Sequence, residues 1–128
     1  MAAEESQRIV LNSNRYFVFS GGLCGAAGVA LSAAAAHSSG EPNLGIAANM
    51  LLFHAPAFLA IGLMGGKKAL RLGGLTLLLG LLVFAGDLLT RVYLGARLFP
   101  MAAPSGGVLM IGGWLGVAAA ALARPSGR

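Results

Sequence analysis

The sequence predicts an all-α integral membrane protein, a four-helix bundle with both termini in the cytoplasm. The chain has 128 residues, of which 57% are hydrophobic and only 10% are charged, and its mean hydropathy is +0.80. In soluble proteins about a quarter of the residues are charged. Four apolar runs are each long enough to cross a bilayer as a helix. We therefore expect one transmembrane domain over residues 15–123, a cytoplasmic lead over 1–14 and a cytoplasmic tail over 124–128.

The first helix is expected over residues 16–36 and carries small residues along one face. Gly22, Ala26, Ala30 and Ala34 recur at four-residue intervals. Small residues at this spacing allow the backbones of two membrane helices to approach closely. The residues that we expect to pack in this way are Gly21, Gly22, Gly25 and Ala26.

The second helix is expected over residues 44–64, after a polar turn over 37–43 in which His37 is a polar helix end. Pro56 cannot donate to the carbonyl of Leu52, so the helix should bend near His54. His54 has two interpretations. It can form a hydrogen bond to a neighbouring helix, or it can relay protons or ligate a tetrapyrrole through a free lone pair. We favour the hydrogen bond, since no second ligand is evident at the same depth.

The third helix, expected over residues 72–93, contains Asp87 and Arg91 in an apolar run. Their i, i+4 spacing places both on one helix face, so the carboxylate can meet the guanidinium within its own helix. The pair is either a proton or ion site or an internally neutralised pair that fixes packing, and we favour the second interpretation. Antiparallel helices would place Asn49 at the depth of Asp87. A line of polar side chains is then possible, formed by Glu41, His37, Asn49, Asp87 and His54.

The fourth helix is expected over residues 104–123 and follows a connector, 94–103, that should lie along the membrane interface. Pro104 suits the first turn of a helix, where its missing N–H costs nothing. Trp114 lies deeper than an interfacial aromatic should, so we expect it to pack against another helix. The small residues of this helix that should also pack are Gly106, Gly107, Gly112 and Gly113.

The distribution of Lys and Arg predicts the orientation. Seven of the nine basic residues are expected on one side and only Arg91 and Arg97 on the other. The basic side is normally cytoplasmic. This arrangement also accounts for the net charge of +5, so we expect no nucleic-acid partner. The seven residues are Arg8, Arg15, Lys67, Lys68, Arg71, Arg124 and Arg128.

Catalytic and metal-binding patterns are not evident in the sequence. The single cysteine, Cys24, excludes an internal disulfide, and no Cys/His spacing typical of zinc sites is present. Gly66-Lys67-Lys68 lacks the first glycine and the Ser/Thr of a phosphate-binding loop. We therefore expect neither an enzyme nor a bound metal or cofactor.

Four segments of the chain resemble a known family. They are AAAAH at 33–37, LLFHAPAFLAIG at 51–62, FAGDLL at 84–89 and APSGGVLMIGGW at 103–114. On these residues the chain resembles the YgdD-like and transmembrane protein 256-like family of small four-span membrane proteins, a domain-of-unknown-function family. Asp87 stands where the family typically has a small hydroxyl residue. The resemblance implies four helices and a bacterial inner membrane or mitochondrial-type membrane.

Three functions remain open at this point. We favour a non-catalytic accessory or assembly subunit that packs against a larger membrane complex or in a homo-oligomer. The reason is that the small-residue faces of the first and fourth helices exceed what one internal contact can use. The alternative is a small proton-coupled or solute transporter that uses Asp87, Arg91, Asn49 and His54. A third possibility is a pigment- or haem-binding subunit that uses His54.

Overall fold

The computed structural model describes residues 1–123, except for the side chains of residues 10, 11 and 13. It contains four helices, and within this range it contains no β-strand. The helices are α1 (Ala2–Ala36), α2 (Pro42–Met64), α3 (Lys68–Leu94) and α4 (Ala102–Leu122). All four are long and apolar enough to cross a membrane. The all-helical fold is confirmed, whereas membrane insertion and the side on which the termini lie stay predictions. The predicted tail, with Arg124 and Arg128, lies outside the described residues.

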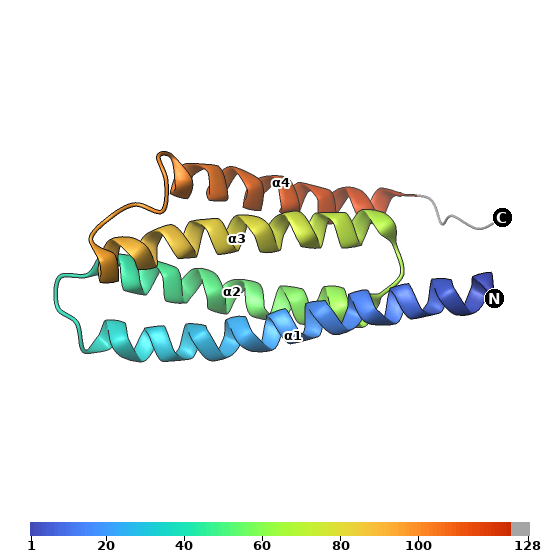
Figure 1. Ribbon diagram of the computed structural model, residues 1–128, viewed down its shortest axis with the longest axis horizontal. Helices are drawn as coiled ribbons and strands as arrows, with labels where there is room; N and C mark the ends of the chain where they lie inside the picture. Colours follow the sequence, from blue (N-terminus) through green and yellow to red (C-terminus); the bar gives the residue numbers. More distant parts are fainter. Residues whose placement is uncertain (124–128) are drawn as a thin grey trace.

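The helices pack in chain order, each antiparallel to the one before it (Figure 1). α1 packs on α2, α4 packs on α3, and α2 and α3 meet in the middle with a smaller contact. The molecule therefore consists of two helical hairpins joined along α2 and α3, with α1 and α4 on the outside. The start of α1 and the end of α4 lie at the same end of the bundle (Figure 1), which is compatible with the predicted common side for both termini.

α1 is longer than the sequence analysis predicted. It begins at Ala2 rather than at residue 16 and contains 35 residues, which gives a length of about 52 Å at 1.5 Å per residue. Residues 2–14 of the predicted lead form the first turns of α1 and extend beyond the other helices (Figure 1), and their cytoplasmic location stays a prediction. No Gly or Pro interrupts the chain before Gly21. Glu4 and Glu5 lie in the first turn, where negative charge interacts favourably with the helix dipole.

The other helix boundaries lie within a few residues of the predicted ones and follow from local chemistry. α2 begins at Pro42, whose fixed φ suits a first helical turn. Gly65 and Gly66 connect α2 to α3 with φ values of +63° and +79°, which only glycine adopts without strain. α3 ends at the left-handed Gly95, a common helix terminator.

Large apolar side chains fill the centre, and glycines bring the backbones of α3 and α4 together. Phe58, Leu77 and Leu81 are fully buried, and the rings of Phe17 and Phe58 stack at 6.4 Å. A Cβ atom on Gly113 would lie 2.6 Å from the backbone nitrogen of Leu77. A Cβ atom on Gly106, seven residues earlier on α4, would lie equally close to the α3 backbone, 2.6 Å from the nitrogen of Phe84. The α3–α4 hairpin therefore depends on glycine at these crossing points.

Candidate functional site

Asp87 and Arg91 form an ion pair near the end of α3. The Asp87 side chain is fully buried, whereas the Arg91 side chain is 32% exposed. Asp87 Oδ2 accepts from Arg91 Nε at 2.9 Å and lies 2.7 Å from Arg91 Nη2. Both of these guanidinium nitrogens contact the same carboxylate oxygen, and the hydrogen bond is charge-assisted. The structure thus brings together the two residues that the i, i+4 spacing placed on one face.

The second oxygen of Asp87 holds the connector between α3 and α4. Asp87 Oδ1 accepts from the backbone N–H of Leu98 at 2.8 Å. Leu98 lies eleven residues further along the chain, so this bond folds the connector back over the end of α3. The hydroxyl of Thr90 donates to the Asp87 carbonyl at 2.8 Å. Both carboxylate oxygens therefore have donors, and the carboxylate acts as a link between the helix and the connector.

His54 links α2 to α4 through Trp114. His54 is buried, with 6% of its surface exposed. Its Nδ1 lies 2.7 Å from the carbonyl of Met50, and Trp114 Nε1 donates to its Nε2 at 3.2 Å. A carbonyl only accepts and an indole N–H only donates, so the neutral ring carries its proton on Nδ1. The Nε2 lone pair, which His54 would need in order to ligate iron, already accepts the hydrogen bond from the Trp114 indole.

Asn49 and His37 form no hydrogen bond with the two polar clusters in the described part of the chain. Both are exposed, as is Glu41, and no hydrogen bond is recorded between any of these side chains and Asp87 or His54 among the described residues. α2 turns Asn49 away from the buried face that contains Ala47, Ala48 and Leu51. The structure therefore does not assemble the continuous polar line that the helix depths allowed. Within residues 1–123 it also contains no group of three or more His, Cys, Asp or Glu residues that could hold a metal ion.

The small residues divide into inward and outward sets. Gly21, Gly106 and Gly113 are buried, and a Cβ atom on any of them would lie within 3 Å of another helix. Gly25 would make an ordinary contact at 3.8 Å with Ala55, and Ala26 is exposed. Trp114 is 45% exposed although its N–H points inward. The outward set comprises Gly22, Gly107 and Gly112, and in the described part of the chain nothing lies within 4 Å of a Cβ atom added to any of them.

Sequence reasoning missed two of the partners in these clusters. The connector had no periodicity that could predict the Leu98 N–H as a donor to Asp87. Trp114 was expected to pack, but its role as hydrogen-bond donor to His54 was not foreseen. A signal for the second did exist, because a buried indole N–H normally requires an acceptor and His54 was the nearest polar group to mid-membrane.

Comparison with known proteins places the chain in a family. The sequence profile of the family described as "Protein of unknown function (DUF423)" matches residues 24–107. The match covers the end of α1, the whole of α2 and α3, the connector and the start of α4. The chain belongs to this family, which confirms the resemblance seen in the sequence. No curated protein and no solved structure matches the chain.

Proposed function

We propose that this protein is a non-catalytic integral membrane protein that serves as an accessory or assembly subunit. It packs against a larger membrane complex or against further copies of itself. We place it as a multi-pass protein in the bacterial inner membrane, with both termini in the cytoplasm. The orientation rests on the seven-to-two distribution of basic residues, and the location rests on the family resemblance.

The outward glycines on α1 and α4 carry this proposal. Gly22, Gly107 and Gly112 lie inside helices, yet no atom from another part of the described chain lies within 4 Å of the position of their missing Cβ atoms. Glycine in a helix interior is destabilising by about 0.5–1 kcal/mol relative to alanine. Close packing of a further membrane helix would offset this cost, because glycine lets two backbones approach. α1 and α4 are also the two outer helices, so their free faces are available to a partner.

The buried polar groups support a structural role for the two clusters. Asp87 has donors on both oxygens, and both ring nitrogens of His54 are engaged. Among the described residues, every buried side-chain nitrogen or oxygen atom has a hydrogen-bond partner. Groups that carry ions or protons must exchange partners during transport, whereas groups that only hold helices together are best fully satisfied. The present arrangement fits the second use.

The size of the native complex tests the proposal. Membranes that contain the tagged chain at natural abundance are solubilised in a mild detergent, and the assembly is sized on a native gel and its subunits are identified. We expect a species larger than the single chain. Gly22→Leu or Gly112→Leu should reduce that size, because a leucine side chain would separate the two surfaces. The isolated chain should keep its melting temperature, since neither glycine has an internal neighbour within 4 Å.

Ile111→Leu is the matched control. Ile111 is also exposed on α4, and the substitution changes shape but adds no volume, so the assembly should keep its size. A single-chain species in the mildest detergent for the unsubstituted protein would contradict the accessory role. Unchanged size for both glycine variants would show that these faces contact lipid alone.

A further inference from the structure

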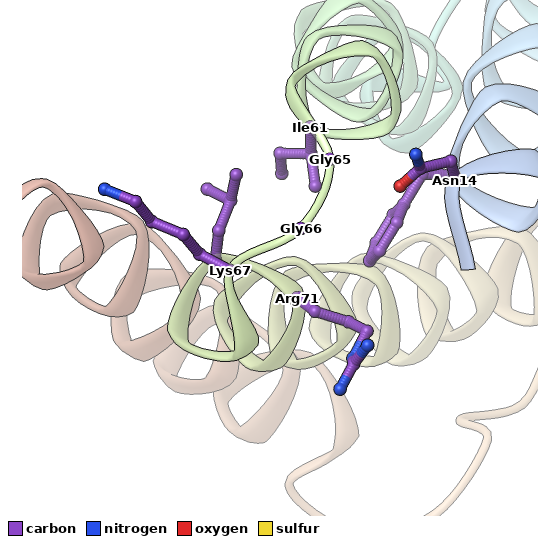
Figure 2. Close-up of a pocket in the computed structure, with 8 residues that line it drawn as sticks. Asn14, Ile61, Gly65, Gly66, Lys67 and Arg71 are labelled. Atoms are coloured by element: carbon purple, nitrogen blue, oxygen red, sulfur yellow. The ribbon is translucent and has the colours of Figure 1, made fainter. Parts of the chain in front are cut away.

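Two neighbouring hollows share Arg71 at the end of the bundle where α3 begins. The first is a small cavity beneath the α2–α3 turn, bordered by Asn14, Gly65 and Arg71 (Figure 2). The second is a groove between α1 and α3 with a volume of about 540 Å³, within the range of small-molecule sites. The groove is lined by Ile9, Asn12, Tyr16, Phe17, Ser20, Arg71, Leu75 and Leu78.

The chemistry of the groove changes with depth. α1 and α3 run in the same direction, and the Phe17 ring lies at the level of Gly74, 2.7 Å from the position of its missing Cβ atom. Arg71 lies nearly one turn outward of this level. Leu78 lies seven residues beyond Arg71, which is about 10 Å along the helix. The groove therefore has a cation towards the bundle end and an apolar wall, formed by Leu75 and Leu78, towards the bundle centre.

Arg71 has no carboxylate partner within the described part of the chain. The one ion pair there joins Asp87 to Arg91, and within residues 1–123 the three side chains that are not described, those of Val10, Leu11 and Ser13, carry no charge. Lys67 and Lys68 add positive charge at the same end of α3. Figure 2 shows the side chains of Lys67 and Arg71 pointing to opposite sides. Arg71 is thus the cation that faces the α1–α3 groove, and it is half-buried there.

We propose that this groove binds an anionic glycerophospholipid, with the lipid phosphate on the Arg71 guanidinium and an acyl chain along Leu75 and Leu78. A guanidinium forms paired, charge-assisted hydrogen bonds with phosphate oxygens. Basic pockets between membrane helices recognise anionic headgroups in this way. A phospholipid has its charge at one end and its hydrocarbon at the other, which is the order of chemistry along the groove. The proposal requires insertion in a bilayer but does not depend on a partner subunit.

Native mass spectrometry of the purified full-length chain in detergent tests the proposal. Phosphatidylglycerol and phosphatidylcholine with the same acyl chains are titrated separately, and the bound fraction is measured. We expect one retained phosphatidylglycerol with an affinity at least fivefold above that for phosphatidylcholine. Glycerol phosphate and inorganic phosphate serve as chain-free competitors, and millimolar amounts of either should not displace the lipid. Displacement by either would show an anion site without an acyl-chain groove and would overturn the proposal.

Arg71→Gln and Lys68→Gln form a matched pair of variants. Both remove one positive charge from the same end of α3, but Lys68 borders neither hollow. Arg71→Gln should lower the affinity for phosphatidylglycerol by about fivefold, the effect expected for one basic residue near an anionic headgroup. Lys68→Gln should change it by less than twofold, and Arg71→Lys should retain most of it. Equal losses for Arg71→Gln and Lys68→Gln would overturn the site, as would equal binding of the two lipids.

Occupation of the groove by a protein helix is the competing outcome. If a partner helix fills the groove in the native assembly, the intact complex should carry no phosphatidylglycerol while the isolated chain binds it. That result would overturn lipid binding as the role of the groove in the membrane. If Arg71→Gln lowers the melting temperature by itself, the comparison of lipids on the unsubstituted chain still decides the proposal.

Discussion

Removing either partner of the Asp87–Arg91 pair should destabilise the protein, and the two losses should differ. Arg91→Gln leaves the Asp87 carboxylate fully buried without its cation. Breaking a buried pair in this way costs about 3–5 kcal/mol. Asp87→Asn has the smaller effect, because the amide oxygen can still accept from Leu98 and Arg91 is already 32% exposed. For that variant we expect about 2 kcal/mol, the value of hydrogen bonds to a charged group.

The double variant, Asp87→Asn with Arg91→Gln, measures how strongly the two residues are coupled. No buried charge remains in it, and the two amides can still share a hydrogen bond. We expect a loss of about 1–2 kcal/mol, so the coupling energy should be at least about 3 kcal/mol. The free energy of unfolding of all four proteins is measured by denaturation in one detergent, with Lys68→Gln, an exposed cation at the other end of α3, as the control for loss of charge.

Two results would refute this reasoning. Additive losses, with no recovery in the double variant, would show that the pair does not act as a unit. A larger loss for Asp87→Asn than for Arg91→Gln would show that burial of the carboxylate is not the dominant effect. A different result would favour a transporter over an accessory subunit. In that case the double variant would be as stable as the unsubstituted protein but would fail to support growth and would lack the flux that Asp87 gives in proteoliposomes.

Three further predictions concern topology, packing and the histidine. In a cysteine-free background, Ser38→Cys should react with an impermeant maleimide from the periplasm and Lys67→Cys should not; the reverse would overturn the charge argument. Gly113→Ala should destabilise the isolated chain by about 1–3 kcal/mol through overpacking, whereas Gly112→Ala should leave it unchanged or slightly more stable, as chemical denaturation would show. Trp114→Phe leaves His54 Nε2 without its donor and should cost about 1–3 kcal/mol; no loss would mean that the bond is not stabilising.

The positions of four apolar helices followed from composition and run length, because a bilayer span imposes its own length on the sequence. The start of α1 did not. Residues 2–14 are mostly polar, so hydropathy marked them as a separate lead, although they contain no Gly or Pro that would break a helix. Hydropathy reports where a segment can enter lipid, whereas helix continuation depends on the backbone. The two boundaries need not coincide, and in α1 they differ by about four turns.

Contacts within one helix could be predicted from residue spacing, but contacts between different segments of the chain could not. The pairing of Asp87 with Arg91 follows from the i, i+4 geometry of α3. The approach of Leu98 to the same carboxylate depends on the path of an irregular connector. Likewise, the depth of Asn49 was deducible, but its direction was not, and α2 exposes it. Depth is set by residue number along a span, whereas direction depends on how each helix rotates about its own axis.

The rotation of α4 about its axis decides which glycine of each consecutive pair faces α3. Neighbouring residues on a helix are about 100° apart around the axis, so two consecutive glycines cannot both face the same helix. Gly112–Gly113 and Gly106–Gly107 divide in this way, with Gly113 and Gly106 against α3 and the other member of each pair outward. The internal hairpin needs only one glycine of each pair. The second has no neighbour within 4 Å of an added Cβ atom among the described residues, which is the observation that supports the proposal of another helix on the outer face of α4.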